Sequence, residues 1–228
     1  LGGTATTLTT DLTLNMGPPA AMVAAAQAAL ARGFTILKVK VGSGYSADID
    51  RLTAIAGVLP DGAALRIDAN QGWNAKEAIR IINKIVELGV PIDLVEQPVP
   101  GEDIAGMVRV TQGTPVPILA DESVHGLADA VRLIQTGGCD LINVKLQKTG
   151  GLDEAGTVIR LAETYGIQCM VGAMMESKIG VDAAANLAAA FGNVTRVDLD
   201  IPDMYDHEPV EGGARYRGPQ IELSDAPG

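Results

Sequence analysis

The chain has 228 residues, of which 47% are hydrophobic and 20% are charged. This composition excludes intrinsic disorder, because a disordered chain has too few apolar residues to form a core. The formal net charge of −11 argues against a nucleic-acid partner, since phosphate binding depends on clustered lysine and arginine side chains.

The sequence also argues against a membrane protein. The longest uncharged internal stretch, residues 12–31, is interrupted by asparagine, glycine, proline and glutamine, so it fits neither a transmembrane helix nor a signal peptide. Cys139 and Cys169 stand in apolar contexts, which favours buried reduced thiols over a disulfide. We therefore expect a cytoplasmic protein with no membrane partner.

Short β-branched runs alternate with longer alanine-rich amphipathic runs along the chain, a pattern typical of βαβ units. Eight strands are predicted at residues 8–14, 35–41, 64–69, 92–96, 117–121, 140–145, 167–172 and 195–199. Seven helices are predicted at residues 18–32, 47–59, 75–87, 103–111, 126–136, 152–165 and 178–190.

This order of elements favours a parallel β/α barrel. An open doubly wound sheet should carry a glycine-rich phosphate loop after its first strand, and no such motif follows Leu14. The segment 201–228 is rich in proline and glycine and predicts an irregular tail in place of an eighth helix. We therefore expect a catalytic barrel over residues 1–200, followed by a C-terminal tail over residues 201–228.

Barrel enzymes place their catalytic side chains at the carboxyl ends of the strands. Charged residues stand at the ends of most of the predicted strands. They are Lys38, Lys40, Asp68, Glu96, Asp121, Lys145, Asp198 and Asp200. From Lys40 to Lys145 they are spaced by about one βα unit each, so a closed barrel would gather them around one mouth.

Three of these residues predict a metal site. Asp68, Glu96 and Asp121 on consecutive strands would repel one another unless a cation lay between them. Carboxylate oxygens suit Mg²⁺, with Mn²⁺ as the alternative. The competing interpretation is that each acid is a helix N-cap or a solvated loop residue.

Two lysines predict proton transfer at carbon. Lys40 and Lys145 would flank the carboxylates on opposite sides, so that a bound substrate would have one amine on each face. A lysine acts as a base only when neutral, and nearby positive charge from Lys38 and the metal would lower its pKa. The alternative is that each lysine lies at the surface or in a salt bridge.

Several strings in the sequence resemble the muconate-lactonizing-enzyme subgroup of the enolase superfamily. They are KVK at 38–40, DANQGW at 68–73, VEQP at 95–98, ADES at 120–123 and NVKLQKTGG at 143–151. The resemblance implies a TIM-like (β/α)7β barrel, which accounts for the missing eighth helix. It also implies that Asp68, Glu96 and Asp121 bind Mg²⁺ and that Lys40 and Lys145 are the acid/base catalysts.

Two C-terminal strings resemble the dipeptide epimerases within this subgroup, most closely the L-Ala-D/L-Glu type: CMVGAMMESKIG at 169–180 and VDLDIPDM at 197–204. The resemblance implies that Asp198 and Asp200 bind the α-ammonium group of the substrate. Their i, i+2 spacing on a strand would point both carboxylates the same way. Lys38 and Glu176 are further candidates for the substrate site.

One feature of the superfamily has no counterpart in the sequence. Its members carry an N-terminal α+β capping domain that closes over the barrel mouth, and nothing before Leu1 supplies one. We therefore expect the capping domain to be absent from this chain, either because the chain is a fragment or because the barrel is bare. An uncapped site would admit water and work more slowly.

The expected function is Mg²⁺-dependent epimerisation of a dipeptide by two-lysine 1,1-proton transfer through an ene-diolate, in a homo-oligomer. Alternatives with the same site are muconate or chloromuconate cycloisomerase, N-acylamino acid racemase and o-succinylbenzoate synthase, whose substrates offer no free ammonium to Asp198 and Asp200. An uncapped barrel fragment with little activity is a second alternative. A Schiff-base aldolase is a third, but it leaves the three acids unexplained.

Overall fold

The computed structural model describes residues 5–205 and 210–224. They form two compact units, the N-terminal unit (residues 12–123 and 132–141) and the C-terminal unit (residues 5–11, 124–131, 142–205 and 210–224). The fold class is α/β barrel-like, and eight strands follow one another in chain order in one sheet, from β2 to β9.

The strands are β1 (Thr7–Thr9), β2 (Leu12–Leu14), β3 (Ile36–Lys40), β4 (Ala64–Asp68), β5 (Ile92–Glu96), β6 (Ile118–Ala120), β7 (Leu141–Lys145), β8 (Gln168–Gly172), β9 (Val194–Asp198), β10 (Arg215–Arg217) and β11 (Gln220–Glu222). The helices are α1 (Pro19–Ala31), α2 (Tyr45–Ala56), α3 (Ala75–Glu87), α4 (Ile104–Gly113), α5 (Leu127–Thr136), α6 (Leu146–Thr149), α7 (Leu152–Thr164), α8 (Lys178–Ala189) and the 3-10 helix η1 (Ile201–Met204).

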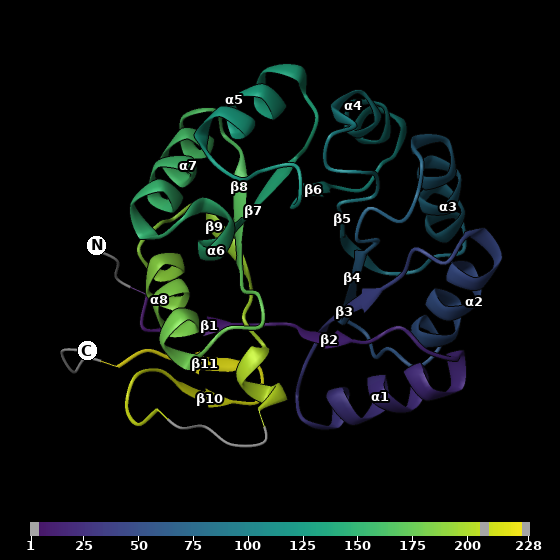
Figure 1. Ribbon diagram of the computed structural model, residues 1–228. Coiled ribbons are helices and arrows are strands. Elements are labelled where there is room, and N and C mark those ends of the chain that lie inside the picture. The colour runs from purple at the N-terminus through teal and green to yellow at the C-terminus, as the bar shows by residue number, and fades with distance from the viewer. Residues whose placement is uncertain (1–4, 206–209, 225–228) are drawn as a thin grey trace. The chain divides into compact units, whose positions relative to one another are not determined.

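In the N-terminal unit, β2 to β6 pair in parallel, and helices α1 to α4 pack against one another in chain order (Figure 1). On β3 the buried apolar residues Leu37 and Val39 alternate with Lys38 and Lys40. Successive side chains of a strand point to opposite faces, so the two lysines share the face opposite the apolar pair.

Helix α3 shows why these segments become helical. Asn74 is its N-cap, and the side chain of Asn74 accepts a hydrogen bond of 3.0 Å from the backbone N–H of Glu77. The buried side chains recur at helical spacing, at Ala75, Ala78, Ile81, Ile82 and Ile85. This apolar stripe packs the helix into the core while its polar face meets solvent.

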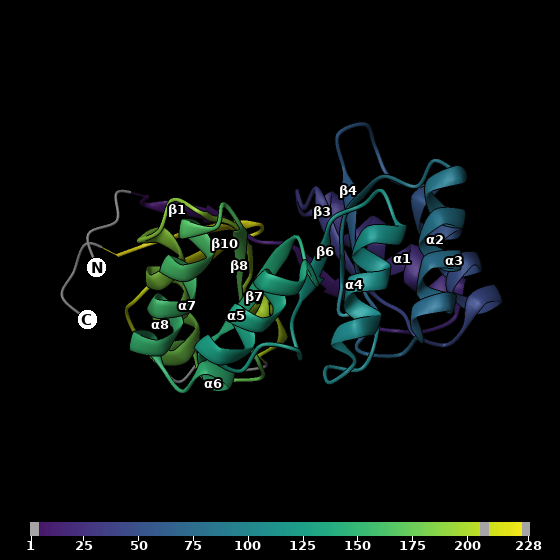
Figure 2. The same cartoon turned by 90° about the horizontal axis from the view of Figure 1, so that it is seen from above.

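In the C-terminal unit, β8 pairs in parallel with β9, and α7 and α8 pack side by side (Figure 2). Helix α8 buries mostly small side chains, including Val181, Ala184 and Ala188, which allow its backbone to approach its neighbours closely. At the end of β9 the backbone N–H of Leu199 donates to Oγ1 of the buried Thr10 over 2.9 Å.

Two expectations about the chain ends were wrong. The predicted strand 8–14 is split, because the backbone N–H of Thr10 donates to the carbonyl of Pro219, outside the parallel sheet. The predicted irregular tail contains β10 and β11, which form a three-stranded antiparallel sheet with β1. Buried Ile221 pairs with Leu8 in this sheet and anchors it. Residues 206–209 and 225–228 of the predicted tail lie outside the described residues.

The cysteine prediction is confirmed: Cys139 and Cys169 are both buried free thiols. Burial, followed by the nearby Asp140 carboxylate, raises the pKa of Cys139 to about 12. No helix in the described parts of the chain has both the length and the apolar character needed to cross a membrane.

Buried Asp48 on α2 organises the loop that follows β3. Its carboxylate accepts hydrogen bonds of 3.1 to 3.2 Å from the three backbone N–H groups of residues 42–44. It also accepts a bond of 2.9 Å from Nε1 of Trp73 and one of 3.0 Å from Arg51. One carboxylate therefore ties together the loops that follow β3 and β4.

Replacing Asp48 with alanine is expected to lower the free energy of unfolding by about 3–5 kcal/mol, the usual cost of removing one partner from a buried ion pair. The substitution leaves Arg51 and several buried donors without their acceptor. Urea unfolding followed by circular dichroism measures the change. The exposed Asp61→Ala variant is the matched control and should change the free energy by less than about 0.5 kcal/mol. Equal values for the two variants would contradict this account of Asp48.

Candidate functional site

The predicted site residues of the N-terminal unit lie at the carboxyl ends of neighbouring strands. Lys40 on β3 is in register with Asp68 on β4, and Asp68 is in register with Glu96 on β5. Asp121 directly follows β6. All three acids are buried, whereas the Lys40 side chain is 35% exposed. The parallel register thus brings Lys40, Asp68 and Glu96 to one edge of the sheet.

Lys38 lies between two of these acids. Its Nζ is 3.1 Å from Oδ2 of Asp68 and 2.8 Å from Oε2 of Glu96, and all three side chains are buried. Buried charges require such pairing, because leaving water is costly for an isolated ion. Lys38 therefore contacts two predicted metal ligands, a role that differs from the predicted contact with substrate.

The acids meet part of the requirement for a divalent ion. Asp68 and Glu96 converge on a single cationic group, the Lys38 ammonium, and hard carboxylate oxygens are the donors that Mg²⁺ prefers. Within residues 5–205 and 210–224, however, no three acidic, histidine or cysteine side chains meet closely enough to hold a metal ion. The donor chemistry fits Mg²⁺, and the complete ligand set with Asp121 stays a prediction.

Gln97, which the sequence analysis gave no role, fixes the strand ends that carry Glu96 and Asp121. Its buried Oε1 accepts hydrogen bonds from the backbone N–H groups of Asp121 (2.8 Å) and Ser123 (3.2 Å). Its Nε2 donates to the carbonyl of Val99 (2.9 Å) and to Oγ of Ser123 (2.8 Å). The sequence feature that could have indicated this role is the amide residue directly after the predicted ligand Glu96, in the string VEQP.

Asn70 contacts Lys40 and Glu122 contacts Asn70, two polar residues to which the sequence pattern assigned no role. Oδ1 of Asn70 accepts a hydrogen bond of 2.6 Å from Lys40 Nζ, and Asp68 Oδ2 lies 3.6 Å from the same nitrogen. The Oε1 atom of Glu122 accepts a hydrogen bond of 3.4 Å from Nδ2 of Asn70. Burial is the main cause that raises the pKa of Glu122, and the neighbouring charges of Asp121 and Asp68 raise it further.

In the C-terminal unit, Lys145 ends β7 and is buried. Gly172 on β8 leaves room for it: a Cβ atom on Gly172 would lie 3.1 Å from Cε of Lys145 and 2.8 Å from Oδ1 of Asn143. A larger residue at position 172 would therefore push against the Lys145 side chain. Because protein interiors are close-packed, this contact limits where the lysine can lie.

Asp198 and Asp200 are both buried at the end of β9. Asp198 is the last residue of the strand and is in register with Gly172 on β8. Asp200 lies beyond the strand, at the N-cap of η1 with φ −82° and ψ 1°. Strand alternation therefore does not set the direction of the Asp200 side chain, and the shared orientation of the two carboxylates stays a prediction.

The Glu176 side chain contacts residues close to it in the sequence. Its Oε1 accepts a hydrogen bond of 3.1 Å from the backbone N–H of Met174, and its other oxygen lies against Gly180 on α8. These contacts stabilise the connection between β8 and α8. The predicted contribution of Glu176 to the substrate site stays a prediction.

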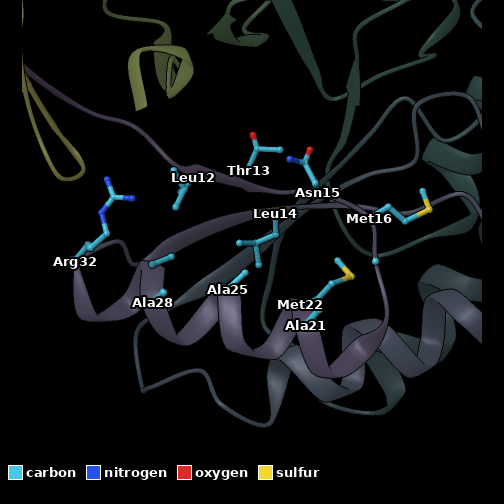
Figure 3. Close-up of a pocket in the computed structure, with 12 residues that line it drawn as sticks. Leu12, Thr13, Leu14, Asn15, Met16, Ala21, Met22, Ala25, Ala28 and Arg32 are labelled. Carbon is cyan, nitrogen blue, oxygen red and sulfur yellow. The ribbon is translucent and has the colours of Figure 1, made fainter. Parts of the chain in front are cut away.

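A cavity of about 430 Å³ lies between β2 and α1 and contains none of the predicted site residues. Leu14 points from β2 toward Met22 and Ala25 on the helix, whereas Thr13 and Asn15 point to the other side of the strand (Figure 3). The apolar lining lacks a cluster of groups that could carry chemistry.

Proteins of the family described as enolase C-terminal domain-like match residues 21–228 of this chain. The L-Ala-D/L-Glu epimerase of Clostridium acetobutylicum is 44% identical to it over 228 residues, which are 100% of this chain and 64% of that protein. The chain therefore spans less than two thirds of the length of this relative.

Two solved structures are also similar. The L-Ala-D/L-Glu epimerase from Bacillus subtilis, solved as a substrate-liganded complex, gives a TM-score of 0.98 at 44% identity, over 100% of this chain and 64% of that one. The dipeptide epimerase from Enterococcus faecalis, solved with Mg and the dipeptide L-Leu-L-Tyr, gives 0.95 at 42% identity, over 99% and 64%. With its strand-end lysines and acids and a family match over residues 21–228, the chain belongs to the enolase C-terminal domain-like family.

Proposed function

We propose that this protein catalyses the Mg²⁺-dependent epimerisation of a dipeptide. The observation that carries the proposal is the register of Lys40, Asp68 and Glu96, which brings an amine and two buried carboxylates to one edge of the sheet. The similarity to dipeptide epimerases that cover the whole chain supports the same reaction class.

Asp68, Glu96 and Asp121 would hold the metal ion. When bound, Mg²⁺ supplies stabilisation for the negative charge that develops on the substrate carboxylate as the α-proton leaves. Gln97 holds the backbone of Asp121, and Lys38 pairs with the other two acids, so these residues keep the carboxylates in place.

Lys40 and Lys145 would exchange protons with the α-carbon from opposite faces. One lysine, as a neutral amine, takes the α-proton and becomes an ammonium, and the substrate becomes an ene-diolate. The other lysine, as an ammonium, returns a proton to the opposite face and becomes neutral. The configuration at the carbon is inverted, and no net proton is gained or lost.

Asp198 and Asp200 would bind the free α-ammonium of the dipeptide by charge-assisted hydrogen bonds. Two carboxylates matched to one ammonium favour a substrate with a free amino terminus. The acyl substrate of an N-acylamino acid racemase and the dianionic substrates of muconate cycloisomerases lack this group. The residue that is epimerised would then be the C-terminal one, because its free carboxylate is the group that the metal ion would bind.

Deuterium exchange tests this proposal. The purified protein, incubated in deuterium oxide with Mg²⁺ and a panel of dipeptides, is expected to introduce one deuterium at the α-carbon of the C-terminal residue, as measured by mass spectrometry and NMR. Excess chelator should stop the exchange, and N-acetylated forms of the same dipeptides should exchange more slowly. If no free dipeptide of the panel exchanges when Mg²⁺ or Mn²⁺ is supplied, the proposal is wrong.

A further inference from the structure

Asn70 occupies an unusual position directly after the end of β4. Its φ of 42° lies in the left-handed region, which asparagine tolerates better than most residues. The backbone N–H of Asn70 donates to Oδ1 of Asp68 over 2.9 Å and holds this conformation. The turn places the Asn70 side chain beside Lys40 on the neighbouring strand.

The neighbours of Asn70 determine which way its amide points. Lys40 Nζ donates a hydrogen bond to Oδ1 of Asn70 over 2.6 Å, and an ammonium has donors alone, so it must face the amide oxygen. On the other side, Nδ2 of Asn70 donates to Oε1 of Glu122 over 3.4 Å. If the amide were flipped, its NH2 group would face the Lys40 ammonium, donor against donor. Its oxygen would face the Glu122 carboxylate, acceptor against acceptor.

We propose that Asn70, oriented by Glu122, is a positioning residue that aims the Lys40 amine at the substrate. This inference rests on the proposed function and assigns a role to two residues that the reaction itself does not use. A neutral Lys40 amine that donates to Oδ1 of Asn70 has its lone pair directed away from the amide oxygen, where it is free to take the α-proton of a substrate. Without this acceptor, Lys40 still has Asp68 Oδ2, 3.6 Å away, as an acceptor.

The two faces of the reaction give a stereochemical test of this role. Exchange in deuterium oxide is measured separately from the two epimers of one dipeptide, and the Lys40→Ala variant defines which epimer depends on Lys40. Asn70→Ala is expected to slow exchange from that epimer about 10- to 100-fold, as displaced supporting groups do, and to leave the other epimer within about twofold. Glu122→Ala should slow the same epimer, and Glu122→Gln, which keeps an acceptor for Nδ2, should restore it.

Asn83→Ala is the matched control, because Asn83 is exposed on α3 and its amide donates to the carbonyl of Gly113 instead. Equal losses from both epimers in Asn70→Ala, or no loss from either, would overturn the positioning role. If the parent protein exchanges neither epimer, the proposed function fails. A crystal structure of Asn70→Ala then tests the positioning role by itself, with Lys40 Nζ expected to move toward Asp68; an unmoved Lys40 overturns the inference.

Discussion

Replacing either Lys40 or Lys145 with alanine is expected to abolish net epimerisation, with a loss of about 100- to 10,000-fold, the usual contribution of a positioned acid or base. Inversion at the α-carbon needs one lysine to remove a proton and the other to return one. Each single variant should nevertheless retain deuterium exchange from one epimer, because the remaining lysine still faces the α-proton of that epimer. Kinetics by polarimetry and exchange by NMR measure the two effects.

The pattern of retained exchange is the decisive part of this prediction. Lys40→Ala and Lys145→Ala should retain exchange from opposite epimers, which a general loss of folding cannot produce. The Lys84→Ala variant, which removes a partly exposed pair with Glu87, is the control and should keep the parent rates. If both single variants retain exchange from the same epimer, the two lysines do not act on opposite faces.

Replacing Asp121 with asparagine is expected to weaken Mg²⁺ binding and to lower the exchange rate at least about 100-fold at a fixed Mg²⁺ concentration, since a catalytic metal contributes several kcal/mol. Asparagine has nearly the same shape, and the backbone N–H of position 121 can still donate to Gln97. The change therefore removes a charge from the proposed ligand set and preserves the local fold. Titration calorimetry measures the metal affinity, and added Mg²⁺ should recover part of the activity.

The free energy of unfolding of Asp121→Asn separates a loss of Mg²⁺ binding from damage to the fold. The charge of Asp121 contributes to the raised pKa of Glu122, so its removal should lower that pKa toward its ordinary value. Urea unfolding of the metal-free variant, compared with that of the parent protein, measures any damage to the fold. Asp61→Asn at an exposed turn is the charge-matched control. Unchanged Mg²⁺ affinity in Asp121→Asn would show that Asp121 is not a ligand.

The barrel-like core could be predicted because its signals are local. The spacing of buried residues in α3 and its N-cap at Asn74 lie within one short stretch, and the predicted limits of that helix, residues 75–87, are the observed ones. The three-stranded sheet could not be predicted in this way. Thr7 pairs with Glu222, and the alternation within three-residue strands is too short to indicate a partner at the opposite end of the chain.

The residues of the candidate site also divide into those that a local pattern predicts and those that it does not. Lys40, Asp68 and Glu96 could be placed from the sequence, because parallel strands bring their carboxyl ends to the same edge of a sheet. Asn70 and Gln97 were missed because their roles depend on positive φ angles, 42° and 35°, that turn the side chains toward neighbouring strands. A sequence pattern shows that a polar residue follows a ligand, but it does not show the dihedral angle that aims it.

The most direct test of the proposed chemistry is a crystal structure of the protein with Mg²⁺ and a slowly reacting dipeptide. The account predicts Mg²⁺ bound by Asp68, Glu96 and Asp121, the substrate ammonium at Asp198 and Asp200, and the Nζ atoms of Lys40 and Lys145 on opposite faces of one α-carbon. A complex in which both amines lie on the same side of that carbon, or in which the ion binds away from the three acids, would contradict it.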